Sequence, residues 1–97
     1  MKIDFEQELK MLDGKAVKMD GKSLTFRAAS VEALLTPKQE DTGNQKAENY
    51  ALAIKIHQSN GQLELKIEEV NELKKRIGEH MTAIVVGQCW KMLEGQG

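Results

Sequence analysis

The segment IEEVNELKKRIGEHM, which spans residues 67–81, carries the clearest helical pattern in the chain. Its apolar side chains recur three or four residues apart and so fall on one face of a helix. These positions are Val70, Leu73, Ile77 and Met81. Glutamates stand early in the segment and basic residues stand late, an order that complements the helix dipole at both ends. We expect Gly78 to mark the break before the next helix, because glycine inside a helix costs about 1 kcal/mol relative to alanine.

Three further helices are expected around this segment. The first begins after Thr25, a residue type that caps helices, and stops near Thr36 because Pro37 disfavours helical geometry in the residue before it. The second spans roughly residues 45–58, and its apolar side chains point in several directions, which suits a central helix packed on more than one side. The last begins after Thr82, which can cap it.

The N-terminal part of the chain predicts a small β-hairpin, with strands near residues 16–19 and 22–25. The turn between them is the dipeptide Asp20-Gly21, a strong turn former. Two strands alone are marginal in water, so the hairpin must lie against helices. Residues 63–67 alternate between apolar and charged side chains, and we favour a lead-in to the helix that follows over a short strand. The predicted fold class is therefore mainly α (α+β): a small N-terminal β-hairpin followed by about four helices.

The length and composition predict one domain over residues 1–97. The chain is 40% hydrophobic and 30% charged, which is typical of a globular protein. Residues 38–46 contain no apolar side chain, and we expect them to form a flexible loop. Gly95-Gln96-Gly97 is expected to end the chain flexibly.

The charge balance bears on which partners are expected. Fourteen basic and fifteen acidic residues give a net charge of -1, and arginine occurs only at Arg27 and Arg76. A nucleic-acid partner is not favoured, because such proteins normally carry an excess of basic residues. No apolar run approaches the length of a membrane span, and the first residues contain no signal sequence. We therefore expect no membrane association and a cytoplasmic location.

No pattern in the sequence predicts catalysis, a metal site or a cofactor. Cys89 is the only cysteine, and a small buried hydrophobe is the favoured interpretation. His57 and His80 are the only histidines that could join it in a metal site or a nucleophile pair, and no short ligand spacing links the three. The carboxylates are all expected to lie on solvated surfaces, and Glu72 is expected to pair with Arg76 one helical turn later. We expect the protein not to be an enzyme.

The most informative feature is a surplus of apolar side chains on the second and last helices. Two interpretations stay open: the N-terminal hairpin and the first helix cover these side chains, or the surplus forms an interface with a second copy or with another protein. The candidate protein interface comprises Tyr50, Leu52, Ile54, Ile56, Val86 and Trp90. In the second of these interpretations the chain self-associates through both helices, as a homo-oligomer.

Six short segments, distributed over most of the chain, carry a resemblance. They are LDGK (12–15), GKSLT (21–25), ALL (33–35), YALAIKI (50–56), VVGQ (85–88) and LEG (93–95). In this order they resemble a family of small, largely uncharacterised accessory proteins encoded by tailed bacteriophages and prophages. The resemblance implies a viral protein that works in the cytoplasm of a bacterial host cell, and it implies no reaction.

Two functions follow from the resemblance and the apolar surplus together. The favoured one is a phage accessory protein that acts by protein–protein interaction, in virion assembly or in modulation of a host factor. The alternative is a nucleic-acid- or nucleotide-binding protein in phage regulation or replication. A shift on DNA that is sensitive to salt would favour the alternative.

Overall fold

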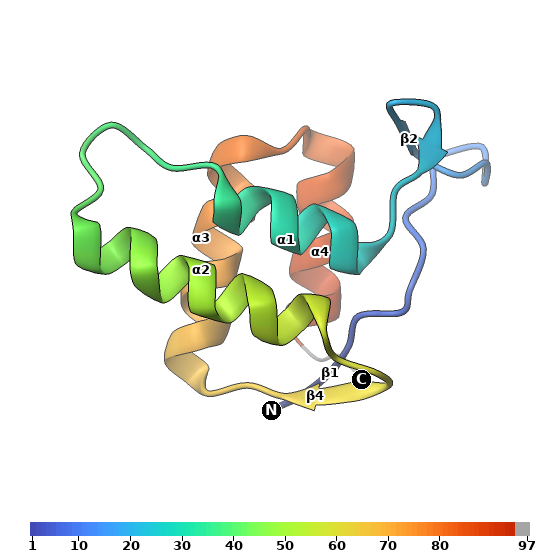
Figure 1. Cartoon of the computed structure of the whole chain (residues 1–97). Coiled ribbons are helices and arrows are strands. Elements are labelled where there is room, and N and C mark those ends of the chain that lie inside the picture. The colour runs from blue at the N-terminus through green and yellow to red at the C-terminus, as the bar shows by residue number, and fades with distance from the viewer. Residues whose placement is uncertain (95–97) are drawn as a thin grey trace.

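The computed structural model describes residues 1–94, which form four helices and two separate two-stranded antiparallel sheets (Figure 1). The helices are α1 (Phe26–Leu35), α2 (Gly43–His57), α3 (Ile67–His80) and α4 (Ala83–Leu93). The strands are β1 (Lys2–Asp4), β2 (Lys18–Met19), β3 (Lys22–Ser23) and β4 (Gln62–Glu64). The predicted fold class is confirmed. The expected flexible end, Gly95-Gln96-Gly97, lies outside the described residues.

The predicted hairpin is the pair β2–β3, in which Lys18 lies opposite Ser23 and Met19 opposite Lys22. Its turn residues, Asp20 and Gly21, have φ angles of 54° and 79°, the left-handed values that a tight two-residue hairpin turn requires. Backbone hydrogen bonds extend the hairpin to a third segment, in which the N–H of Leu9 donates to Leu24 and its carbonyl accepts from Val17. We call residues 8–25 the β-arm.

A second sheet joins the N-terminus to the segment before α3. Strand β1 pairs with β4 so that Ile3 lies opposite Leu63. The expectation that residues 63–67 form only a lead-in to a helix is therefore wrong for Leu63 and Glu64. Their alternating pattern is a strand because a partner strand about 60 residues earlier satisfies their backbone groups.

Helix α2 begins earlier than the sequence pattern indicated. The Thr42 hydroxyl accepts a hydrogen bond from the N–H of Gln45, and the Gln45 side chain accepts one from the N–H of Thr42. This reciprocal capping box starts a helix within a polar stretch. The predicted loop at 38–46 is therefore too long, because residues 43–46 already belong to α2.

Gly78 lies inside α3 and does not end it, which corrects the sequence-based expectation. The helix continues to His80, and the break comes at Met81. A Cβ atom at Gly78 would lie 3.1 Å from the Cζ2 atom of Trp90. Glycine at this position therefore lets the indole of α4 lie directly on the backbone of α3.

The core lies where the helices meet the first residues of the chain. Helix α1 packs against both α2 and α3, and α4 packs against α3 (Figure 1). The rings of Phe5 and Phe26 stack with centroids 4.7 Å apart. The buried apolar side chains of the described residues are Ile3, Phe5, Leu9, Leu24, Phe26, Ala29, Ala33, Leu34, Leu52, Ala53, Ile56, Leu65, Val70, Leu73, Ile77, Val85, Cys89 and Leu93.

Two helical glycines predict opposite responses to alanine. Gly87 in α4 has open space where a Cβ would lie, so Gly87→Ala raises the free energy of unfolding by about 0.5–1 kcal/mol. Gly78→Ala gains less, because the added methyl group presses on Trp90. Urea unfolding of both variants measures the two gains, and equal gains would contradict the close contact between Trp90 and Gly78.

Candidate protein interface on helices α1 and α2

The structure separates the six predicted interface residues into three groups. Leu52 is 6% exposed and Ile56 is fully buried, so both belong to the core and leave the candidate surface. Tyr50 is 59% exposed and Ile54 is half-buried, both on α2. The other two, Val86 and Trp90, lie on α4.

Trp90 is already engaged within the chain. Its Nε1 atom donates a hydrogen bond of 3.1 Å to the carbonyl of Lys74, and the Lys74 ammonium lies 4.7 Å from the ring centroid. Helix α4 packs against α3, whereas α2 packs against α1. The structure therefore does not bring the predicted residues of α2 and α4 together in one surface.

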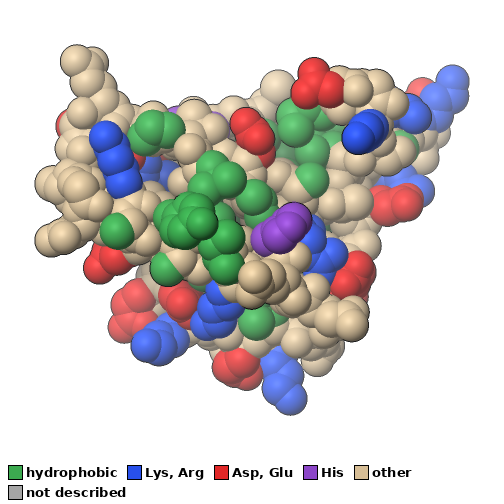
Figure 2. All heavy atoms as spheres, in the orientation of Figure 1, with side chains coloured by type: hydrophobic (Ala, Val, Ile, Leu, Met, Phe, Trp, Pro, Cys, Tyr) green, Lys and Arg blue, Asp and Glu red, His purple; other side chains and the backbone are tan. Residues whose placement is uncertain are grey.

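Tyr50 and Ile54 instead join apolar side chains of α1. The two helices run antiparallel, since Arg27 at the start of α1 donates to the carbonyl of Ile56 near the end of α2. Figure 2 shows hydrophobic side chains gathered over this pair of helices. We define the α1–α2 patch as Val31, Leu35, Pro37, Tyr50 and Ile54.

Sequence reasoning missed the α1 half of this patch. Leu35 is 51% exposed, but it is absent from the candidate interface predicted from the sequence. A signal was present: the apolar residues of this helix are too many to lie on one face.

A hollow of about 220 Å³ lies at one end of the patch, between the end of α1 and the start of α2. Its apolar walls come from both helices and from the loop between them, and Lys46 contributes a charge. The lining residues are Leu34, Leu35, Pro37, Asp41, Lys46, Asn49 and Tyr50. The hollow could accommodate an apolar side chain of a partner protein.

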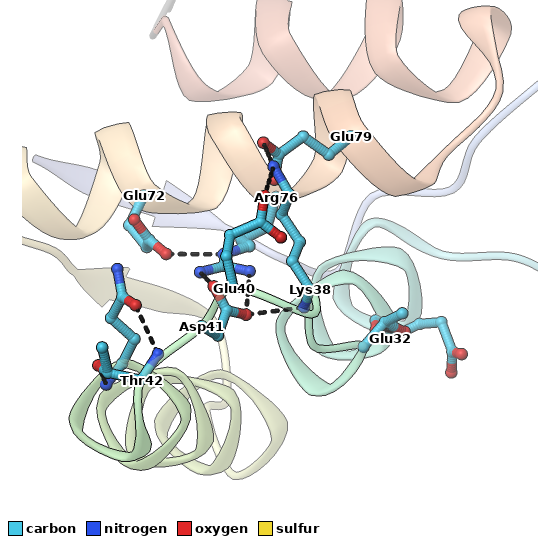
Figure 3. Close-up of polar contacts among 10 residues, drawn as sticks. Glu32, Lys38, Glu40, Asp41, Thr42, Glu72, Arg76 and Glu79 are labelled. Carbon is cyan, nitrogen blue, oxygen red and sulfur yellow. Dashed lines mark hydrogen bonds and ion pairs between the residues drawn. The ribbon is translucent and has the colours of Figure 1, made fainter.

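A buried ion pair fixes the polar side of this hollow (Figure 3). The guanidinium of Arg76 holds the carboxylate of Asp41 with two hydrogen bonds of 2.7 and 2.9 Å, and its Nε donates to Glu72 at 2.8 Å. The backbone N–H of Lys38 also donates to Asp41 at 2.8 Å. Two bonds between a planar guanidinium and one carboxylate give a fixed geometry, so the loop before α2 is tied to the middle of α3.

The sequence predicted one contact of Arg76 but not the burial of its pair with Asp41. The predicted Glu72–Arg76 pair is confirmed at one helical turn. The expectation that all carboxylates are solvated is wrong for Asp41, whose side chain is 5% exposed, while that of Arg76 is 1% exposed. The guanidinium of Arg76 lowers the pKa of Asp41 to about 2, and the Lys38 N–H adds to this effect.

A second ion pair, which is partly exposed to solvent, lies beside the buried one. The Lys38 ammonium lies 2.7 Å from a carboxylate oxygen of Glu79 on α3 (Figure 3). This contact raises the pKa of Lys38 and lowers the pKa of Glu79. Lys38 and Asp41 thus both connect the same loop to the same helix.

The remaining chemistry-bearing residues lie apart from one another. Cys89 is fully buried, and burial raises the pKa of its thiol to about 12. His57 is exposed near the end of α2, and His80 is half-buried at the end of α3. Over residues 1–94, no three His, Cys, Asp or Glu side chains cluster as a metal site would require. No helix in this part of the chain has the length and hydrophobicity needed to span a membrane.

Comparisons with known proteins found no matching family model, no matching curated protein and no matching solved structure.

The Asp41 carboxylate predicts a specific dependence of stability on pH. Its pKa falls from an ordinary value of 3.8 to about 2 in the folded chain, so it stabilises the fold above about pH 4 and loses this contribution as the pH falls towards 2. Asp41→Asn removes the titrating group. The wild type should therefore have a higher free energy of unfolding than the variant. This difference should be largest above about pH 4 and should shrink towards about pH 2. A difference that is constant over this range would contradict the lowered pKa.

Proposed function

We propose that this chain is a binding protein that contacts another protein through the α1–α2 patch. The observation that carries the proposal is the exposure of Leu35 and Tyr50, 51% and 59%, on two helices packed against each other. Contiguous apolar side chains on a folded surface mark protein contacts, and tyrosine is enriched in them.

The physical basis is that the patch is ordered before it binds. Four of its five side chains lie on helices, and Pro37 lies in the loop between them, which is held by Asp41 and Lys38. A surface that is already ordered loses little conformational entropy on association. Burying one such side chain contributes roughly 1.5–3 kcal/mol, so a few of them offset the cost of association.

We propose that the partner is either a second copy of the chain or a protein of the bacterial host or phage. A second copy is the simplest partner, because a symmetric dimer uses the same patch twice. The phage setting, with a role in virion assembly or in modulation of a host factor in the cytoplasm, is supported by the sequence resemblance.

Nucleic-acid or nucleotide binding in phage regulation or replication receives less support from the structure. Both arginines of the chain are used internally. Arg27 holds Glu6 through two hydrogen bonds and also donates to the carbonyl of Ser59, and Arg76 is buried. Arginine is the side chain best suited to phosphate and base contacts. Because both arginines are engaged within the chain, nucleic-acid or nucleotide binding is the less supported alternative.

Sedimentation velocity tests the proposed patch. We expect the wild type to self-associate at high micromolar concentration, and Tyr50→Glu to remain a folded monomer, because a buried unpaired carboxylate opposes association. Ile67→Glu is the matched control, since Ile67 is 56% exposed at the start of α3 and lies outside the patch. This control should behave as the wild type does.

A photo-reactive cross-linker at position 50 covers the case of a different protein as partner. In bacterial cells that carry the phage genes, it should join the chain to one protein, whereas the same cross-linker at exposed Asn71 of α3 should not. A wild type that stays monomeric, together with equal cross-linking from positions 50 and 71, would end the proposal.

A further inference from the structure

A second exposed apolar surface lies on the β-arm, which projects away from α2 (Figure 1). Leu12 is 98% exposed and Met11 is 45% exposed, both at the tip of this arm. They border a shallow groove of about 860 Å³ between the arm and α4. Its apolar lining comes from Met11, Leu12, Ala16 and Ile84, and its charged lining from Asp13, Lys15 and Lys18.

Hydrogen bonds connect the tip of the arm internally and join it to α4. Within the tip, the N–H of Gly14 donates to Met11 at 2.9 Å and that of Met11 donates to Lys15 at 2.6 Å. The side chain of Gln88 accepts from the N–H of Lys10 at 2.9 Å and donates to its carbonyl at 2.7 Å, as a neighbouring strand would. Leu12 is almost fully exposed on a loop that these hydrogen bonds already order, so a partner that binds it causes little further loss of conformational entropy in the backbone.

The surroundings of the groove are positively charged, in contrast to the chain as a whole. Residues 10–22 contain four lysines and two aspartates, whereas the net charge of the chain is -1. Among residues 1–94, no carboxylate lies within ion-pairing distance of Lys15, Lys18 or Lys22. The Asp13 carboxylate accepts a hydrogen bond from the backbone N–H of Lys15, which occupies it locally. Figure 2 shows basic side chains, together with acidic ones, beside hydrophobic side chains at the upper right.

We propose that this groove binds an acidic amphipathic segment of a partner protein. Apolar side chains of that segment would cover Leu12 and Ile84, and its carboxylates would pair with Lys15 and Lys18. An anionic membrane shares this chemistry but fits the shape less well, because a flat bilayer would contact the projecting tip and leave the recessed groove uncovered. The site is separate from the α1–α2 patch and does not depend on the function proposed for that patch.

A displayed library of random peptides, each about 15 residues long, tests the proposal on the full chain. Selection should enrich peptides that combine glutamate or aspartate with apolar residues at helical spacing. The most enriched peptide, added to isotope-labelled protein, should shift the amide resonances of residues 10–22 and 84–88 and leave those of α2 unchanged. Leu12→Ser and the double variant Lys15→Glu/Lys18→Glu should each weaken its binding by about tenfold or more.

Two controls make the result specific. Ile67→Ser removes another exposed aliphatic side chain, one that is 56% exposed at the start of α3, and Lys75→Glu reverses an exposed charge on the same helix; both variants should bind the peptide as the wild type does. Leu12→Ser keeps the fold because Leu12 contacts almost nothing, so its effect reports binding alone. The proposal is overturned by a selection without enrichment, by peptides that bind at α2, by equal binding to the arm variants, or by tighter binding to vesicles of phosphatidylglycerol than to any peptide.

Discussion

The buried ion pair between Arg76 and Asp41 is the interaction on which the placement of three helices depends. A guanidinium that is fully removed from water destabilises the fold unless its N–H groups are paired. Here Nε binds Glu72, and both terminal nitrogens bind Asp41. Asp41 lies just before α2 and Arg76 lies on α3, so these two helices cannot separate without unpairing the charge, and α1 packs against both of them.

The position of the α1–α2 patch follows from this buried ion pair. The loop that contains Lys38 and Asp41 is tied to α3, and this places Pro37 and the start of α2 on either side of one hollow. The β-arm is fixed by a different device, the two hydrogen bonds from Gln88 to the backbone of Lys10. The chain thus presents two exposed apolar surfaces on separate supports.

The local parts of this structure could be predicted from the sequence because their causes lie within a few residues. Thr25 caps α1 through the N–H of Ala28, and the turn at Asp20 and Gly21 takes the positive φ angles that its sequence indicates. Contacts between distant residues could not be predicted in this way. The pairing of β1 with β4 and the position of Trp90 over Gly78 depend on which elements meet, and a local pattern does not contain that information.

The candidate site shows the same division. Of the six candidate interface residues, Tyr50 and Ile54 remain at the surface of α2, and the structure adds Leu35 beside them. The prediction that Leu52 and Ile56 belong to the interface was wrong, because both are buried. Helical spacing tells which residues share a face, but it does not tell which face a neighbouring helix covers. Asp41 was missed because its neighbours are polar, and nothing in that stretch indicates a guanidinium 35 residues later.

A double-mutant cycle on the buried pair tests the central claim most directly. The cycle compares the free energies of unfolding of the wild type, Arg76→Met, Asp41→Leu and the double variant, measured in urea. If the two side chains hold the loop before α2 on α3 through each other, each single variant is strongly destabilised. The double variant is then less destabilised than the sum of the two, because neither charge is left buried alone. Destabilisations that simply add would show that the two charges act independently and would contradict the account.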